Sequence, residues 1–404
     1  MPSGWRSMSL GEIAQWGSGG TPKRTNPSYF GGSIPWVVIG DLTDGVVTDS
    51  STYITEDGLR ASTARWIPPG AVLLAMYGSI GKLGIAGIPL TTNQAIAHAV
   101  VRDGLVDAKY LFWYLRSIRD KLRRAGKGGT QQNISQSVIR GLPIPVPPLD
   151  EQRRIVLAVE EQLTRISSGQ GSLDHAHRRL RVYWRSLLTA LTTPTPSWHT
   201  VPLTALASGG KHSLAIGPFG SNLKVSDYRE SGVPLIFVRN VRTGQFLNGE
   251  TRFVSATKAS ELAPHQVVSG DVLVTKMGDP PGDAALYPAG CPPAIITADV
   301  IKITVDRTIC QPEFLVAALG SAPFRAAMLS ITQGVAQKKV SLERFKKISV
   351  PLPPLYDQRA IVDEASRQRS SVEILDSELR ASHVRADALR MMVLRRAFTG
   401  QFVP

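Results

Sequence analysis

The sequence is poor in cysteine and contains no long apolar run. Cys291 and Cys310 are the two cysteines among 404 residues, and they form no CxxC pair, so neither a disulfide framework nor a cysteine-based zinc site is expected. No stretch of about 18 apolar residues is present, which argues against a membrane-spanning helix. Residues 1–6 lack the apolar core of a signal peptide. We therefore expect a folded protein of the reducing cytoplasm.

Common catalytic signatures are also missing. The sequence has no GxxxxGKS/T, HExxH or GxSxG pattern and no GxGxxG after an expected strand. Its acidic residues are scattered singly, so no paired carboxylates of a nuclease are indicated. Residues 78–82, Gly-Ser-Ile-Gly-Lys, end like a phosphate-binding loop, but the glycine spacing is wrong and Leu83 follows Lys82. We expect no catalytic site in this chain.

One segment bears on an enzymatic alternative. Asn26-Pro27-Ser28-Tyr29 is similar to the Asn-Pro-Pro-Tyr loop of adenine methyltransferases, with a serine in place of the second proline. Such an enzyme would also need a glycine-rich loop for S-adenosylmethionine after an early strand, and the sequence has none. A solitary DNA adenine methyltransferase with its own recognition domains therefore remains an alternative, and a loop position is the simpler interpretation of this segment.

Acidic residues are too few to balance the basic ones. Lys and Arg number 46 against 32 Asp and Glu, which gives a net charge of +14 and a pI of about 10.0. A surface of this charge attracts polyanions and accelerates encounter with them. The excess lies in residues 1–145 and 193–350, whereas residues 146–192 and 351–404 are nearly balanced. These two basic segments are where we expect a polyanion to bind.

The chain contains an internal duplication. Pro145-Val146-Pro147-Pro148-Leu149, followed by Gln152-Arg153 and Ile155-Val156, recurs 206 residues later as Pro351-Leu352-Pro353-Pro354-Leu355, Gln358-Arg359 and Ile361-Val362. Residues 34–39 match 233–238, and residues 69–74 before Gly78 match 269–274 before Gly278. Landmarks in one order across both halves indicate a tandem of two similar units.

Each unit is expected to consist of a mixed globular domain followed by a long helix. The globular parts are short β-branched runs broken by Gly, Pro, Asn and Asp, with a helix such as residues 109–124. Proline-rich segments end each domain. The predicted fold class is α+β, with a first globular domain at residues 1–147, a helical segment at 148–192, a second globular domain at 193–353 and a second helical segment at 354–404.

The helical segments carry narrow apolar stripes. Residues 149–191 contain no proline and place Val156, Leu163, Leu173, Leu180 and Leu187 on one seam, with Gln170 and His177 as polar insertions. Residues 355–398 repeat apolar positions every seven residues. About 43 residues at 1.5 Å each give a rod of about 60 Å. We expect the two helices to form an antiparallel coiled coil; the alternative is that each packs on its own domain.

This arrangement resembles the specificity subunit of type I restriction–modification systems over essentially the whole chain. The motifs that carry the resemblance are Gly20-Thr21-Pro22, Tyr29-Phe30-Gly31-Gly32, Ile34-Pro35-Trp36, Gly78-Ser79-Ile80-Gly81-Lys82, Asn93-Gln94 and the doubled Pro-x-Pro-Pro-Leu-x-x-Gln-Arg block. The resemblance implies that each domain reads one half of a split, asymmetric site in double-stranded DNA. The helices would then set the gap between half-sites and dock two methylation subunits.

The resemblance also implies which chemistry lies elsewhere. Methylation subunits would supply S-adenosylmethionine, and restriction subunits would supply ATP-dependent translocation and cleavage with Mg²⁺, so no cofactor is expected in this chain. A protein-interaction scaffold that never touches DNA is a further alternative. An RNA-binding protein is disfavoured because the aromatic motifs of an RNA-recognition sheet are missing.

The candidate contact residues follow from charge, amide chemistry and matching positions. Lys and Arg suit phosphates and guanine, and Asn and Gln suit adenine. The predicted DNA-binding residues are Lys23, Arg24, Lys82, Gln131, Gln132, Asn133, Lys224, Arg239, Asn240, Lys276, Gln337, Lys338 and Lys339. The predicted partner-binding or helical-spacer residues are Gln152, Ile155, Leu163, Trp184, Gln358, Ile361 and Leu379. For each one taken singly, the simpler interpretation is an ordinary surface or seam residue.

Overall fold

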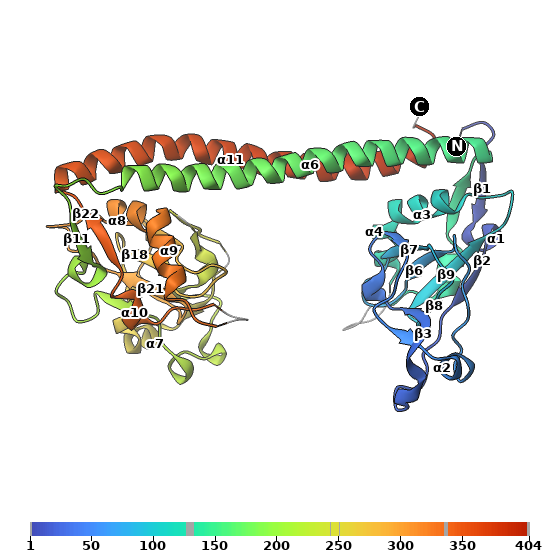
Figure 1. The fold of residues 1–404 in the computed structure, drawn as a ribbon, viewed down its shortest axis with the longest axis horizontal. Helices are drawn as coiled ribbons and strands as arrows, with labels where there is room; N and C mark the ends of the chain where they lie inside the picture. The colour runs from blue at the N-terminus through green and yellow to red at the C-terminus, as the bar shows by residue number, and fades with distance from the viewer. Residues whose placement is uncertain (1, 127–132, 243, 250, 335–337, 402–404) are drawn as a thin grey trace. The chain divides into compact units, whose positions relative to one another are not determined.

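The computed structural model describes residues 2–126, 133–242, 244–249, 251–334 and 338–401. The chain forms two compact units: Met1–Leu173 with Ala381–Pro404, and Asp174–Arg380. Each unit contains one globular domain together with a part of each of the two long helices (Figure 1). The predictions of a tandem repeat and of mixed α/β domains are confirmed.

The first domain is built on two sheets. Its five-stranded sheet has the order β2-β9-β6-β7-β4, namely Ala14–Ser18, Ile96–Val101, Val72–Ala75, Leu83–Ala86 and Gly45–Val47. A three-stranded sheet has the order β5-β3-β8, namely Tyr53–Ile54, Phe30–Val37 and Thr91–Thr92. β1 (Arg6–Ser9) pairs antiparallel with β10 (Pro143–Val146) and so connects the beginning of the domain to its end.

The apolar runs of the sequence explain which strands are central. All four residues of β6 are buried, and β6 pairs on both sides, with β7 and β9. Helix α3 (Ala108–Ser117) packs on β6 and β7 (Figure 1) and is capped by Asp107, whose side chain accepts the amides of Lys109 and Tyr110. The remaining helices are α1 (Leu10–Ile13), α2 (Glu56–Arg60), α4 (Arg119–Ala125) and α5 (Gln136–Arg140).

The second domain repeats this plan. One sheet has the order β12-β21-β18-β19, namely Leu214–Ile216, Val300–Ile303, Val272–Thr275 and Ala284–Leu286. The other has the order β16-β13-β20-β17, namely Phe253–Val254, Val233–Ile236, Ala294–Ile296 and Gln266–Val267. β14 (Val241–Arg242) pairs with β15 (Gln245–Phe246), and β11 (His199–Pro202) with β22 (Ser349–Leu352). The helices are α7 (Ala256–Glu261), α8 (Pro312–Leu319), α9 (Ala322–Ser330) and α10 (Leu342–Phe345).

The two long helices, α6 (Leu149–Leu191) and α11 (Leu355–Ala397), run antiparallel where they meet within each unit. In the first unit, Gln170 donates to Asp387 at 2.9 Å and Arg390 donates to Ser167 and Gln170 at 3.0 Å. In the second unit, Nε2 of His177 lies 3.4 Å from Oδ1 of Asp376. The polar insertions predicted at Gln170 and His177 are thus contacts between the helices.

The helix ends also pack on the domains. Val159 and Leu163 of α6 join the core of the first domain, and so do Leu394 and Ala397 of α11. Phe398, just after α11, makes edge-to-face contacts with Tyr110 and Tyr114, with ring centroids 5.2 and 5.3 Å apart. Ile361 of α11 joins the core of the second domain. The two expectations for the helices, mutual pairing and packing on a domain, therefore hold at different positions along them.

A buried glutamine joins each domain to its helix. Gln152 donates from Nε2 to the carbonyls of Leu105 at 3.0 Å and Pro147 at 2.8 Å, and its Oε1 accepts the amide of Asp107 at 2.9 Å. Gln358 makes the same contacts with Ile309, Pro353 and Gln311, at 2.9, 2.8 and 2.7 Å. Both side chains are fully buried, so each carboxamide replaces water for three backbone groups.

We predict that Gln152→Leu lowers the free energy of unfolding by about 1–3 kcal/mol, because it leaves one backbone donor and two acceptors buried without a partner. Urea unfolding of the full chain, followed by circular dichroism, measures the change. Gln15→Leu, at an exposed position of β2, is the matched control and should have little effect. Equal stability of the Gln152→Leu and parent chains would show that the glutamine is dispensable.

Candidate nucleic-acid interface

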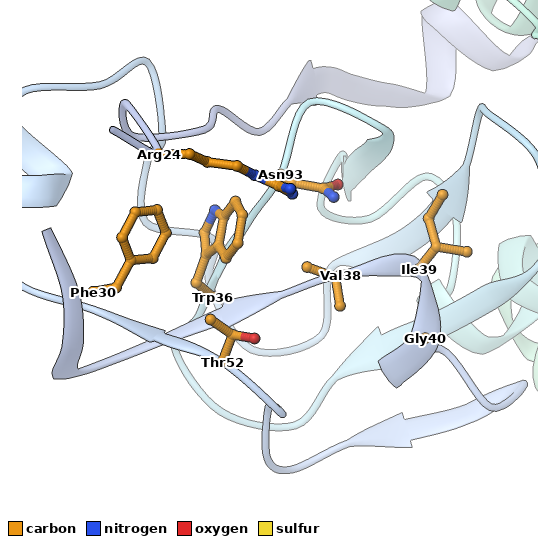
Figure 2. A pocket seen from close by; sticks show the side chains of 8 residues that line it. All are labelled: Arg24, Phe30, Trp36, Val38, Ile39, Gly40, Thr52 and Asn93. Carbon is orange, nitrogen blue, oxygen red and sulfur yellow. The ribbon is translucent and has the colours of Figure 1, made fainter. Parts of the chain in front are cut away.

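A cavity in the first domain lies beside the predicted residues Lys23 and Arg24. Both are exposed in the loop that follows β2. Arg24 is one of eight residues around a cavity of about 690 Å³, and Figure 2 shows its side chain extending beside Asn93 over Trp36. Trp36 is held by a hydrogen bond from its Nε1 to Gly20 O at 2.9 Å. The cavity thus presents a guanidinium and a carboxamide above apolar walls.

Lys82 reaches the wall of the same cavity from another loop. Its Nζ donates to the carbonyl of Ile39 at 3.3 Å, and Ile39 lines the cavity. The ammonium has two further donors for a ligand. The half-buried Lys82 side chain therefore holds the loop at Ile39 by a hydrogen bond, and it also adds a positive charge beside the cavity.

The glycines at 78 and 81 are explained by backbone conformation, because both have a positive φ. Gly81 has φ +85°, and an added Cβ would lie 2.8 Å from Cγ of Arg119. Arg119 donates to the carbonyl of Gly81 at 2.8 Å and forms an ion pair with Asp44. Partial burial acts to raise the pKa of Asp44, but the Arg119 guanidinium outweighs it and leaves that pKa below its usual value. The close packing against Arg119 therefore accounts for a glycine at position 81.

Asn133 adjoins the same part of the first domain. It is exposed and forms an isolated β-bridge with Tyr77, which lies just beyond the end of β6. Gln131 and Gln132 lie outside the described residues. The prediction for these two glutamines therefore stays a prediction.

In the second domain, Lys224 and Arg239 are exposed, whereas Asn240 is not available to DNA. The guanidinium of Arg239 lies 4.3 Å from the ring centroid of Phe237. Asn240 is buried, accepts the amide of Phe237 at 2.9 Å and donates to the carbonyl of Leu247 at 3.0 Å. Asn240 stabilises the turn that it ends, and its assignment as a DNA contact is wrong because both ends of the carboxamide are engaged inside the domain.

Lys276 is buried under an aromatic ring. It follows β18 directly, and its Nζ lies 3.4 Å from the carbonyl of Ala298 and 4.7 Å from the ring centroid of Phe219. Desolvation lowers the pKa of Lys276, against a smaller opposing effect of Asp299. The sequence predicted a surface cation here, and the structure corrects this to a cation covered by Phe219.

The segment of Lys338 and Lys339 adjoins Lys276, whose carbonyl accepts the amide of Val340 at 3.0 Å. Lys338 forms an ion pair with Asp279 at 2.8 Å. Lys339 is exposed and its backbone pairs with Met277 and Gln333. Gln337 lies outside the described residues. The β-bridge from Met277 to Lys339 corresponds to the bridge from Tyr77 to Asn133 in the first domain, so the matching loops converge at the end of the matching strand.

Sequence reasoning overlooked Phe219, a residue that is 56% exposed. Gly217, two positions before Phe219, is the feature of the sequence that could have drawn attention to this loop. Gly217 lies so close to the backbone of Thr297 that a Cβ would collide with it, and Gly19 lies in the same way against Thr92. Aligning these two glycines places Phe219 opposite Thr21, two positions on in each loop.

Most of the predicted partner-binding or spacer residues are interior. Gln152, Ile155, Leu163, Gln358 and Ile361 are buried within their own unit. They belong to the helical segments as predicted, but they present no surface to another protein. Trp184 and Leu379 are partly exposed, and the guanidinium of Arg369 lies 5.9 Å from the Trp184 ring centroid. The exposed apolar side chains of the helices are instead Leu157, Val182, Tyr183, Leu355, Tyr356, Ile374, Leu375, Val384, Leu389 and Met392.

Within residues 2–126, 133–242, 244–249, 251–334 and 338–401, no group of three or more His, Cys, Asp or Glu side chains is placed to hold a metal ion. In that same part of the chain, no helix combines the length and apolarity needed to cross a membrane.

Comparison with known proteins points to one family. The model of the type I restriction modification DNA specificity domain matches residues 2–167 and 248–375. The specificity subunit of the type I restriction enzyme MjaIX from Methanocaldococcus jannaschii is 29% identical over 160 residues, which cover 38% of this chain and 37% of that protein. The EcoR124I/EcoR124II specificity subunit from Escherichia coli is 30% identical over 200 residues, covering 47% of this chain and 49% of that protein.

A solved structure supports the fold. A chain from a study of complex assembly and conformational transition in a type I R-M system has a TM-score of 0.73 at 19% sequence identity, and the match covers 98% of both chains. The family model covers most of the present sequence, in both halves of the duplication. This chain therefore belongs to the family of type I restriction–modification DNA specificity proteins.

Proposed function

We propose that this chain selects the DNA sequence on which a type I restriction–modification enzyme acts, by binding a two-part asymmetric duplex site, and that it performs no catalysis itself. The observation that carries the proposal is that the two domains share one backbone plan but expose different side chains in matching loops. In matching loops the first domain exposes Asn133 and the second exposes Lys339, and beneath them lie the buried Met76 and Lys276. Domains with one backbone plan and different polar groups would read different bases.

The electrostatics support a duplex ligand. The net charge of +14 suits a phosphate backbone. Lys23, Arg24, Lys224 and Lys339 are exposed and lie in loops rather than in the cores. Such residues would fix register on phosphates, while the side chains beside the cavity of the first domain and around Lys276 would reach base edges.

The division of labour with other subunits is part of the proposal. Two methylation subunits would bring S-adenosylmethionine and modify adenine, and restriction subunits would bring ATP and Mg²⁺ for translocation and cleavage. Apolar side chains exposed on the helices support docking of a protein there: Tyr356 is 84% exposed and Ile374 is 65% exposed. Contiguous exposed apolar surface indicates a protein interface, and on α11 such residues occur in adjacent pairs, Leu355 with Tyr356 and Ile374 with Leu375.

The proposal is tested on the assembled enzyme with the site that it methylates. Sequencing of methylated adenines in the source cell should give two unlike half-sites with a fixed gap. The purified complex should prefer that duplex to a scrambled one by at least about a thousandfold. Equal binding to both duplexes would support a scaffold instead, and binding of S-adenosylmethionine by the chain alone would support a solitary methyltransferase.

We predict that Lys339→Ala reduces the dependence of log K on log salt concentration by about one unit, the value of one lost phosphate contact. Lys338→Ala should reduce it less, because Lys338 is already paired with Asp279. Fluorescence anisotropy at several salt concentrations measures both slopes. Lys258→Ala, which removes a lysine paired with Glu261 on α7, is the control, and an unchanged slope for Lys339→Ala would remove that residue from the interface.

We predict that Tyr356→Ser with Ile374→Ser weakens association with the methylation subunits by about tenfold or more, because interface aromatics often contribute about 2 kcal/mol each. Analytical ultracentrifugation of the mixed subunits measures the loss. Val225→Ser removes an 80% exposed apolar side chain from the second domain and should not affect assembly. Unchanged assembly of the double variant would place the docking surface elsewhere.

We predict that lengthening both helices lengthens the gap between half-sites. Seven residues added after Leu173 in α6 and seven after Arg380 in α11 preserve the heptad register and add about 10 Å of helix, or about three base pairs. Methylation mapping with the variant enzyme should return the same half-sites with a longer gap. An unchanged gap would refute the spacer role of the helices.

A further inference from the structure

Phe219 is an exposed aromatic side chain that the second domain holds in a defined place. It follows Gly217 and Pro218, which are both buried. Gly217 donates to the carbonyl of Val300 at 3.2 Å and lies against the backbone of Thr297, where a side chain would not fit. On its other side, Asn222 donates to the carbonyl of Phe219 at 3.1 Å. The loop therefore presents Phe219 outward from a fixed backbone.

One face of the Phe219 ring is occupied by a cation. The ammonium of Lys276 lies 4.7 Å from the ring centroid, a distance at which a cation is attracted to the face of the ring. Lys276 is itself fixed on both sides: its amide donates to Asp299 O at 2.8 Å, and its carbonyl accepts Val340 N at 3.0 Å. The ring is thus supported from within the domain, and 56% of the residue remains exposed.

The surroundings of the ring are basic. Lys339 is close enough to Lys276 to lower its pKa, next to the larger effect of desolvation. Among the ion pairs formed by the described residues, none includes Lys276 or Lys339. Of these two lysines, Lys339 is exposed and Lys276 is buried. An apolar ring with an accessible lysine nearby matches a duplex, in which phosphates flank the apolar groups of the bases.

Resting on the proposed function, we propose that Phe219 determines specificity in the second half-site by contacting the 5-methyl group of a thymine in the major groove. Apolar side chains, phenylalanine among them, recognise thymine through this methyl group. Lys276 lies over one face of the ring, which leaves at most the other face and the ring edge for a ligand. A methyl group needs one face, whereas an intercalating ring would need both faces between bases.

The first domain shows what varies at this position. Thr21 occupies the place of Phe219, and its hydroxyl bonds to Gln94. Met76 occupies the place of Lys276, one residue after the matching strand. The anchoring glycine is common to both loops, but the displayed group is a hydroxyl–amide pair in one domain and a ring on a cation in the other. A position whose backbone is the same in both domains, but whose side chain differs between them, is suited to recognising different DNA bases.

The test exchanges thymine for uracil, which removes only the methyl group. The assembled enzyme is titrated with duplexes that carry the mapped site, with each thymine of each half-site replaced in turn. At one position of one half-site, we expect uracil to weaken binding by the unmodified enzyme about fourfold. This is the change in affinity expected when one buried methyl-sized group is lost. Phe219→Ala should bind the thymine duplex as weakly and show no further loss with uracil.

Two further variants keep the result interpretable. Lys276→Met reproduces the side chain of the first domain, should fold normally, and should reduce the thymine-to-uracil ratio because the ring loses its support. Val268→Ala removes a 48% exposed apolar side chain before β18, at the opposite end of that strand from Lys276, and should keep the parental ratio. Thermal unfolding of each variant confirms that it is folded.

The outcomes separate this inference from the proposed function. An enzyme without preference for the mapped site would overturn the proposed function, whatever Phe219 does. With that preference intact, the inference is overturned if Phe219→Ala keeps the parental thymine-to-uracil ratio, or if neither half-site contains an A·T pair that responds to uracil. A third outcome uses 2-aminopurine placed in the half-site, whose fluorescence increases when its base is unstacked. An increase that requires Phe219 but not the thymine methyl group would show that the ring is inserted between bases, and this would also overturn the inference.

Discussion

The junction between each domain and its helix depends on one buried carboxamide. The proline-rich segment before each helix has few backbone donors, because proline lacks an N–H group. Gln152 supplies donors to Pro147 and Leu105 and accepts from Asp107, and Gln358 does the same in the second half. The duplicated Pro-x-Pro-Pro-Leu-x-x-Gln block is therefore a hydrogen-bonding unit, which explains why it is the strongest repeat in the sequence.

With that junction in place, the two domains can differ at their surfaces without losing their common plan. The central strands β6 and β18 are buried throughout and pair on both sides. The loops beyond these strands contain Met76 and Lys276 at equivalent places. Surface groups can thus vary at the ends of strands whose packing is fixed by apolar side chains, and this separation would let one architecture serve the two half-sites proposed above.

The fold was largely predictable, because the duplication, the apolar strands and the heptad stripes are properties of spacing. The individual site residues were less so. Asn240, Lys276 and Gln152 are polar in the sequence like any surface residue, but the first completes a turn, the second lies under a ring and the third bridges three backbone groups. Which polar group is internal depends on contacts between segments far apart in the chain, and the sequence of one segment does not contain them.

Phe219 shows the converse. Phenylalanine is usually interior, but here Phe219 is exposed in a loop that passes against Thr297 because Gly217 has no side chain. A glycine that admits a close backbone contact can thus turn an apolar side chain outward.

The packing of Leu394, Ala397 and Phe398 in the core of the first domain has a consequence for synthesis. The ribosome makes this domain first, but Tyr110 and Tyr114 lack their aromatic neighbour until the segment around residue 398 has emerged. The nascent first domain must persist with an open apolar site throughout translation of the second. Premature release anywhere in the second half therefore yields a first domain with an incomplete interior, suited to capture by chaperones and proteases.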